Sequence, residues 1–289
     1  MNTLEQLTAQ DKGNYRTYLD RMSQSCATSS KHLIPFYTIG CNTILDVGCA
    51  DGTLMKAIQA VNPTARVVGI DLNQNAVDLA TAAGLEVYKT DFKDICEQLQ
   101  IKFDCIIFSS VLHEISSYDK EFPFSKAPID RAIILANKSL VEGGTLIIRD
   151  GLMDHTFCRV CSMTFHNPND IKWFKRFLAE FKYPYMDFDS FEYWGNVTCD
   201  PELAQEFFAT YTWGEDSWHR EIQEKFCILD ENTWTYTVRE KLFDIIAFFK
   251  SKEEYPQFLK EKVSVKNEWG NEVFPYMTCT IVAQKKGEF

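Results

Sequence analysis

The sequence predicts an α/β protein whose core is an open, doubly wound sheet. From residue 41 onward, stretches typical of strands alternate with stretches typical of helices, which is the pattern of parallel strands joined by crossover helices. Several strand stretches are continuous apolar runs, as expected for strands that helices cover on both faces. The first strand ends in a glycine-bearing turn, at the edge where such sheets bind ligands.

The strands and helices of this sheet follow one another in a regular order. Strands are expected at Thr43–Val47, Arg66–Asp71, Glu86–Lys89, Phe103–Ser109 and Thr145–Arg149 and, after a long interruption, at Phe243–Lys250 and Met277–Gln284. Helices are expected near Leu54–Val61, Gln74–Ala83, Ile129–Leu140 and Thr233–Lys241. The sheet domain therefore takes up residues 41–150 and 231–289.

Two segments lie outside this alternation. Residues 1–40 predict an N-terminal helical cap, because apolar side chains recur there at helical spacing. These side chains are Tyr15, Leu19, Met22 and Cys26. Residues 151–230 hold four of the six tryptophans together with helical patterns, so they predict a mostly helical, aromatic-rich insertion that forms a lid over the sheet. A turn-like stretch at Asn267–Asn271 indicates a second, smaller insertion.

Composition narrows the class of protein. The chain has 289 residues, of which 45% are hydrophobic and 25% charged, as in a soluble globular protein with a sizeable core. The N-terminus lacks a signal-peptide pattern and no stretch reaches the ~18 apolar residues of a membrane helix, so a cytoplasmic protein without a membrane partner is expected. The ten cysteines are expected to be reduced thiols. A net charge of −11 argues against a broad nucleic-acid-binding face.

The turn after the first strand reads Asp46-Val47-Gly48-Cys49-Ala50-Asp51-Gly52. Glycines let the backbone approach a ligand where any Cβ would collide, and the helix that follows presents N–H groups at its positive end. Asp71 ends the second strand about twenty residues later, where a carboxylate can accept both ribose hydroxyls of an adenosine ligand. The alternative for Asp71 is the N-cap of the next helix.

At these residues the chain resembles the class I S-adenosylmethionine-dependent methyltransferases of the type 11/12 kind. The similarity covers roughly residues 40–150, with a weaker match in the last two strands, and it implies a seven-stranded Rossmann-like sheet that binds S-adenosylmethionine. Ala50 stands where many members carry a glycine. The donor-binding residues implied are Asp46, Gly48, Cys49, Ala50, Gly52, Asp71, Leu72, Asp91, Phe92 and Ser109.

The resemblance gives these residues separate roles. Gly48 and Gly52 lie against the methionine part of the donor, and Asp71 binds the ribose. Asp91 binds the adenine amino group while Phe92 packs on the ring. The alternative for Thr90-Asp91-Phe92 is a surface turn with a buried phenylalanine.

His113 and Glu114 follow the fourth strand, at the edge that flanks the sulfonium and the acceptor in this family. Methyl transfer is an in-line displacement, so the protein mainly aligns the nucleophile and removes its proton where needed. A histidine suits that task. We therefore predict His113 and Glu114 as catalytic residues; the alternative is that His113 caps the next helix or lines the donor site. Arg149 and Asp150 face the same cleft or form an ion pair at the base of the lid.

Two further patterns allow opposing interpretations. His155, Cys158, Cys161 and His166 contain a CxxC pair with flanking histidines, but a zinc site usually needs a second, well-spaced ligand pair, which is missing. No metal is therefore expected. The aromatic run at residues 209–220 suits either core packing or stacking against a planar or cationic acceptor.

The favoured function is methyl transfer to a small-molecule acceptor bound between the sheet edge and the insertion, because the insertion is aromatic and the chain is acidic. The alternatives are a methyltransferase for tRNA, RNA or a protein side chain, a non-catalytic S-adenosylmethionine-binding module, and an NAD-dependent oxidoreductase. The short Gly48-x-Ala50-x-Gly52 spacing argues against the last, because a dinucleotide turn places its final glycine one position later.

Overall fold

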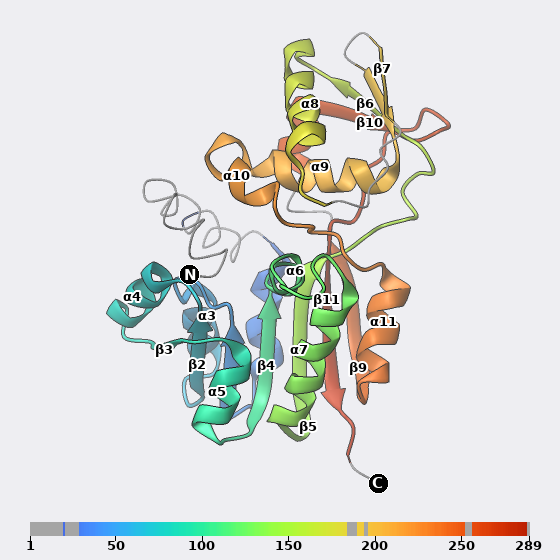
Figure 1. Cartoon of the computed structure of the whole chain (residues 1–289). Helices are drawn as coiled ribbons and strands as arrows, with labels where there is room; N and C mark the ends of the chain where they lie inside the picture. The colour runs from blue at the N-terminus through green and yellow to red at the C-terminus, as the bar shows by residue number, and fades with distance from the viewer. Residues whose placement is uncertain (1–19, 21–28, 184–189, 194–195, 252–255, 288–289) are drawn as a thin grey trace.

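A seven-stranded sheet forms the centre of the larger part of the molecule (Figure 1). The computed structural model describes Asp20 and residues 29–183, 190–193, 196–251 and 256–287. The strand order is β3-β2-β1-β4-β5-β11-β9. The sheet strands are β1 (Thr43–Val47), β2 (Arg66–Asp71), β3 (Glu86–Lys89), β4 (Phe103–Ser109), β5 (Leu140–Gly151), β9 (Phe243–Ser251) and β11 (Thr278–Lys285).

The predicted doubly wound sheet is confirmed. β1 to β5 pair in parallel, whereas β11 is antiparallel to both of its neighbours. The order reverses between β1 and β4, and this switch point is where the fold class binds ligands. The helices of the sheet domain are α3 (Thr53–Val61), α4 (Gln74–Ala82), α5 (Phe92–Leu99), α6 (Leu112–Ser117), α7 (Lys126–Ser139) and α11 (Glu231–Glu240).

Helices cover both faces of the sheet, which explains the continuous apolar strands. One face packs against α3, α4 and the 3-10 helix η1 (Ser30–Thr38), through side chains such as Ile34 and Met55. The other packs against α5, α7 and α11, through side chains such as Ile133 and Trp234. The part of residues 1–40 that carries the predicted helical stripe lies outside the described residues. No helix in the described ranges is long and apolar enough to cross a membrane.

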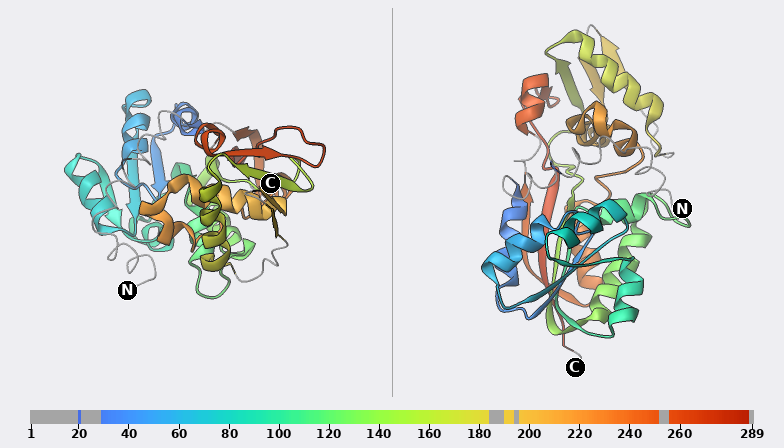
Figure 2. Two further views of the ribbon diagram at one scale, coloured as in Figure 1. Left: turned by 90° about the horizontal axis from the view of Figure 1, so that it is seen from above. Right: turned by 90° about the vertical axis from the view of Figure 1, so that its left-hand side faces the viewer.

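A smaller cap lies beyond the carboxyl edge of the sheet (Figures 1 and 2). It contains a second, four-stranded antiparallel sheet in the order β10-β6-β8-β7. Its strands are β6 (Cys161–Phe165), β7 (Ser190–Tyr193), β8 (Asn196–Cys199) and β10 (Val263–Lys266). Its helices are η2 (Pro168–Asp170), α8 (Ile171–Glu180), α9 (Pro201–Trp213), η3 (Glu215–Ser217), α10 (Trp218–Glu221) and α12 (Pro256–Lys262).

The cap differs from the predicted insertion in two ways. Residues 151–230 contain more helix than strand, but the helical prediction missed β6, β7 and β8. The second insertion was predicted, but its place in the cap was not: it supplies β10 to the same sheet by pairing Val263 with Phe165. This pairing joins residues about a hundred positions apart, so local periodicity does not reveal it. The turn at Asn267–Asn271 is confirmed, with the N–H of Asn267 donating to the carbonyl of Asn271 at 3.0 Å.

Candidate active site

The donor turn between β1 and α3 requires glycine at two positions. Gly48 and Gly52 have φ of 72° and 78°, in the left-handed region that side chains disfavour. A Cβ on Gly48 would lie 2.7 Å from Val111 Cγ2, and one on Gly52 would lie 2.1 Å from Leu85 Cδ1. The turn is therefore held close to the start of α6 and to the chain before β3.

Asp71 fastens this turn to the end of β2. Its Oδ2 accepts the N–H of Ala50 at 3.0 Å and its Oδ1 accepts the N–H of Asn73 at 2.8 Å. The residue that caps α4 is Asn73, so the alternative that Asp71 is the N-cap is wrong. Burial raises the pKa of Asp71. Ala50, at the position of the family's glycine, has a φ of 48° and accepts the left-handed backbone that glycine would adopt freely.

We expect Gly52→Ala to lower the free energy of unfolding by about 2–4 kcal/mol, because a side chain there meets both left-handed strain and Leu85. The matched control is Ala50→Gly, two residues earlier. It removes backbone strain from the folded protein but adds conformational freedom to the unfolded chain. The free energy of unfolding is therefore expected to change by no more than about 1 kcal/mol. Urea denaturation of both variants measures the difference. Equal stabilities would contradict this interpretation of the turn.

Asp46 and Ser109 lie beside the donor turn on the face of the sheet that packs against η1. Both are buried, and within the described residues Asp46 Oδ2 and Ser109 Oγ have no hydrogen-bond partner. Burial raises the pKa of Asp46 to about 7, and the cation of Lys31 opposes this shift. Two polar atoms that are buried beside a glycine turn suit a polar, cationic ligand such as the amino-acid end of S-adenosylmethionine.

Asp46 also gives a test that needs no ligand. Its folded pKa of about 7 exceeds the ordinary carboxyl value of about 4 in the unfolded chain, so stability should fall as pH rises between these values. An Asp46→Asn variant should therefore unfold at a higher temperature than the natural protein above pH 7. The gap should close toward about pH 4. Thermal unfolding across this range measures the gap, and a gap that is the same at every pH would contradict the assigned shift.

The remaining predicted donor residues differ in how they are placed. Cys49 is buried, with its thiol beside Gly69 and 3.8 Å from the carbonyl oxygen of Ala50. Leu72 is half-buried directly after Asp71. Asp91 is exposed and caps α5 by accepting the N–H of Asp94 at 3.0 Å. Phe92 is buried.

Phe92 packs edge-on against Phe108 with ring centroids 5.2 Å apart. This geometry matches the surface turn with a buried phenylalanine. The adenine contact stays a prediction.

His113 is held by Asp150 at the carboxyl ends of β4 and β5. Asp150 Oδ1 lies 2.7 Å from His113 Nδ1, while its Oδ2 accepts the N–H groups of Val111 and Leu112 at the start of α6. The carboxylate thus fixes both the helix start and the imidazole, so that Nε2 points away from the sheet. The side chains of Arg149 and Asp150 leave opposite faces of β5. Arg149 bonds Ser30 and Ser110, and the ion pair between Arg149 and Asp150 is not formed.

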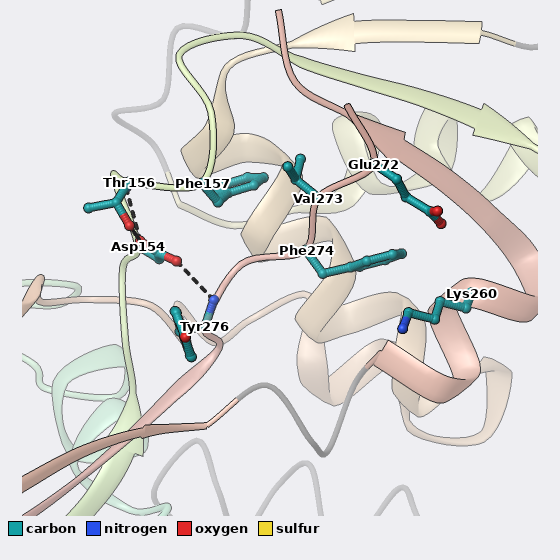
Figure 3. Close-up of a pocket in the computed structure, with 8 residues that line it drawn as sticks. All are labelled: Asp154, Thr156, Phe157, Lys260, Glu272, Val273, Phe274 and Tyr276. Atoms are coloured by element: carbon teal, nitrogen blue, oxygen red, sulfur yellow. Dashed lines mark hydrogen bonds between the residues drawn. The ribbon is translucent and has the colours of Figure 1, made fainter. Parts of the chain in front are cut away.

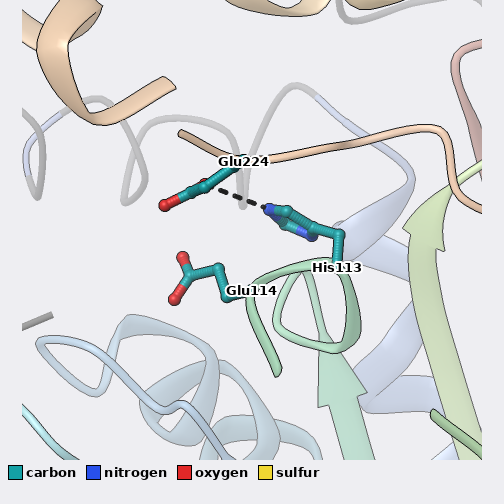
Figure 4. A group of neighbouring side chains, drawn as sticks. All are labelled: His113, Glu114 and Glu224. Atoms are coloured by element: carbon teal, nitrogen blue, oxygen red, sulfur yellow. Dashed lines mark ion pairs between the residues drawn. The ribbon is translucent and has the colours of Figure 1, made fainter. Parts of the chain in front are cut away.

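The cap brings Glu224 to His113 (Figure 4) and Arg220 to Glu114. Glu224 Oε2 lies 3.6 Å from His113 Nε2, and Glu224 Oε1 accepts the hydroxyl of Tyr118 at 2.7 Å. Arg220 Nη2 lies 2.8 Å from Glu114 Oε1, and its Nε lies 3.3 Å from Glu224 Oε1. The predicted catalytic residues His113 and Glu114 therefore contact two charged side chains from the cap. These are the guanidinium of Arg220 and the carboxylate of Glu224.

The charges in this group shift several pKa values. Burial acts to lower the pKa of His113, but Asp150 and Glu224 outweigh it and hold the pKa well above its usual value. Burial acts to raise the pKa of Asp150, and the opposing effect of His113 keeps it below the usual value. Burial raises the pKa of Glu114 to about 7 against the effect of Arg220. His113 is therefore mainly an imidazolium at neutral pH.

The other patterns singled out in the sequence lie elsewhere. His155 pairs with Asp230 at 3.7 Å, and His166 Nε2 lies 2.9 Å from Ser264 Oγ. Cys158 and Cys161 are buried in the cap core. The four side chains of the possible zinc site therefore do not lie together. Most of the aromatic run at residues 209–220 serves core packing, and Trp218 is fully buried there.

A cavity of about 630 Å³ lies at the junction of the cap and the sheet domain (Figure 3). Two chain segments that cross between them line it, with Lys260 at its edge. Asp154 joins these segments by accepting the N–H of Tyr276 at 3.0 Å. None of the predicted donor or catalytic residues lines this cavity, so it is distinct from the His113 group.

The sequence profile of a family described as a methyltransferase domain matches residues 41–224. This stretch contains the donor turn, Asp71, the His113 group and much of the cap. The chain belongs to the class I S-adenosylmethionine-dependent methyltransferase family. The resemblance inferred from the donor turn is thereby confirmed.

Two curated relatives match this methyltransferase over part of its length. A carboxy-S-adenosyl-L-methionine synthase of Helicobacter hepaticus is 28% identical over 148 residues, which are 49% of this chain and 56% of the relative. The ribosomal RNA large subunit methyltransferase E of Zymomonas mobilis is 25% identical over 112 residues, which are 37% and 49% of the two chains. The chain thus spans about half the length of the curated relatives it matches.

Solved structures show the same fold at low sequence identity. The plantazolicin methyltransferase BpumL in complex with SAH has a TM-score of 0.52 and 12% identity, with 96% of this chain and 90% of that chain covered. Human N-acetylserotonin methyltransferase in complex with SAM has a TM-score of 0.51 and 12% identity, with 93% and 55% covered. These similarities support the fold of the methyltransferase.

The sequence alone missed four residues of this methyltransferase that surround the predicted site. Lys31 lies near Asp46, and Tyr118, Arg220 and Glu224 complete the group around His113. Tyr118 carried a usable signal, because it is the C-cap residue of α6 and follows Glu114 by about one helical turn. Arg220 and Glu224 come from the cap a hundred residues later, and only the fold brings them here.

Proposed function

We propose that this methyltransferase transfers a methyl group to a small-molecule acceptor held between the carboxyl edge of the sheet and the cap. The observation that carries the proposal is the position of Glu224 and Arg220, two cap residues in contact with His113 and Glu114. The side chains of all four are at most 16% exposed. A site enclosed in this way suits an acceptor that fits inside it.

The chain's residues would divide the work between donor and acceptor. S-adenosylmethionine supplies an electrophilic methyl group on a cationic sulfur. Asp71 would hold the ribose, and Asp46 and Ser109 would hold the amino-acid end. His113 Nε2 would accept the proton that the acceptor loses, while Asp150 keeps the ring oriented through Nδ1. The placement of these side chains at one edge of the sheet supports these proposed roles.

Electrostatics supports a small acceptor over RNA. Affinity for RNA depends mainly on lysine and arginine contacts to phosphates, whereas this chain has a net charge of −11. The group around His113 is itself rich in carboxylates. A polyanion would be repelled at the point where its methylated atom must enter.

Incubation with tritiated S-adenosylmethionine and a fractionated cell extract tests this proposal. We expect label in the fraction that passes an ultrafiltration membrane, and no label above background in RNA or protein. A His113→Gln variant serves as the control for enzyme-independent labelling. Label confined to RNA or protein would contradict the small-molecule proposal and would favour a macromolecular acceptor.

A further inference from the structure

The surroundings of His113 contain more carboxyl groups than basic groups. Among the residues that the structure describes, the carboxyl groups interacting with His113 come from α6, β5 and the cap, whereas Arg220 is the cation in contact with Glu114 and Glu224. The carboxyl groups are Glu114, Asp150, Glu221 and Glu224, with Asp71 acting on Glu114 from β2. A group of this kind favours a ligand that brings positive charge.

We propose that the acceptor presents an amine nitrogen, bound as its ammonium form between Glu114, Glu224 and His113. The inference rests on the proposed function and names the class of acceptor that the same site takes. It assigns Glu114 and Glu224 as acceptor-binding residues and His113 as the base.

Distances in the group fit an ammonium ion. One ligand atom from each of His113, Glu114 and Glu224 lies within 4.8 Å of the others (Figure 4). A nitrogen about 2.9 Å from each could bridge atoms at this spacing. Tyr118 and Arg220 both contact Oε1 of Glu224, whereas Oε2 is the oxygen that faces His113 Nε2. Oε2 is thus placed to receive an acceptor N–H.

Charge disfavours the other common acceptor classes. A carboxylate or phosphate placed beside Glu224 would be repelled by the charge of that carboxylate. When His113 is in the neutral form that acts as the base, the carboxylates of Asp150 and Glu224 outnumber the cation of Arg220, and a neutral hydroxyl would leave this difference without compensation. Burial raises the pKa of Glu114 to about 7 and also raises that of Glu221, and the charge of Glu224 adds to both shifts.

A divalent metal is the other cation that could bind these three side chains, since carboxylate oxygens and an imidazole nitrogen are ordinary ligands. Arg220, however, already contacts an oxygen of Glu114 and of Glu224. A metal ion would place two positive charges beside this guanidinium. A singly charged ammonium adds less repulsion, so we favour the amine and make the metal an outcome of the test.

The proton released in the transfer step goes to the neutral form of His113, which becomes more abundant as pH rises. The ammonium gives one proton to Nε2 of this form, and Asp150 and Glu224 stabilise the imidazolium that forms. The lone pair freed on nitrogen forms a bond to the methyl carbon while the carbon–sulfur bond breaks. The electron pair of the broken bond remains on sulfur. The product is a methylated ammonium ion and a neutral thioether.

The test uses the full chain and S-adenosylmethionine labelled with ¹³C in the methyl group. After incubation with the ultrafiltrate of a cell extract, the carbon chemical shift of the transferred methyl separates N–CH₃ from O–CH₃ products. We expect N–CH₃ signals. O–CH₃ or S–CH₃ signals in small molecules would overturn the amine and leave the proposed function standing. The absence of any labelled small molecule would overturn both.

Two further experiments distinguish an amine site from a metal site and test the role of Glu224. Transfer that stops with EDTA and returns with Mg²⁺ or Mn²⁺ would overturn the amine site in favour of a metal site. With the labelled amine in hand, Glu224→Gln should raise its KM about tenfold or more, with the S-adenosylmethionine Kd unchanged. The matched control is Glu215→Gln, which changes an exposed glutamate paired with Arg176. An unchanged KM in Glu224→Gln would also overturn the proposal.

Discussion

Replacing His113 by glutamine should lower kcat by about 10²- to 10⁴-fold, which is the usual contribution of a general base. The imidazole is placed for this role because Asp150 holds Nδ1 at 2.7 Å and leaves Nε2 toward the cap. The Kd for S-adenosylmethionine should change little, because the predicted donor contacts lie on other residues. Steady-state kinetics and calorimetry on the same preparation measure both quantities.

The pH profile distinguishes a base from a structural histidine. Asp150 and Glu224 outweigh burial and raise the pKa of His113 well above its usual value, so the neutral form becomes more abundant as pH rises. kcat/KM should therefore rise through this raised pKa, and the rise should vanish in His113→Gln. His155→Gln is the matched control, because His155 is exposed and pairs only loosely with Asp230. If His113→Gln keeps the natural rate, His113 is not the general base.

Replacing Asp71 by alanine should weaken S-adenosylmethionine binding by about 10- to 100-fold, as expected for the loss of hydrogen bonds to a charged group. The same change removes the tether to the N–H groups of Ala50 and Asn73. Stability should therefore fall as well. Calorimetric titration and thermal unfolding measure the two effects.

A donor analogue isolates the ribose contact from the tether. The 2′,3′-dideoxy form of S-adenosylmethionine lacks the hydroxyls that Asp71 would bind, so the natural protein and Asp71→Ala should bind it with similar Kd. Asp51→Ala is the control, because Asp51 accepts the N–H and the hydroxyl of Thr53 at the start of α3 and has no predicted ribose contact. If Asp71→Ala weakens both ligands equally, Asp71 serves the turn rather than the ribose.

The local sequence pattern was sufficient to predict the strands of the seven-stranded sheet. The observed bounds of β1, β2, β3 and β4 coincide with the predicted ones. β1, β2 and β4 are largely apolar runs, and β3 is a short stretch that turn residues bound. β5 is longer than expected: it begins at Leu140, where α7 ends, and runs through two glycines at residues 143 and 144. The residues of β5 that pair with β4 jump from Leu140 to Thr145, and Gly143 has a φ of 73°, so the glycines mark an irregularity within the strand rather than its end.

The features that could not be predicted from the sequence depend on contacts between residues that lie far apart in the chain. The donor turn could be predicted because Asp46, Gly48 and Gly52 lie within seven consecutive residues. The group around His113 could be predicted only in part, because Glu224 and Arg220 arrive from the cap. The sheet within the cap escaped prediction for the same reason, since β6 and β10 come from separate insertions.

Isothermal titration calorimetry of the natural protein with S-adenosylmethionine and, separately, with NADH tests the central claim most directly. The glycine spacing, Asp71 and the buried oxygens of Asp46 and Ser109 together predict a one-to-one complex with S-adenosylmethionine, with a Kd in the micromolar range that is typical of enzyme ligands. No heat of binding is expected with NADH. A protein that binds NADH and fails to bind S-adenosylmethionine would contradict the donor site described above.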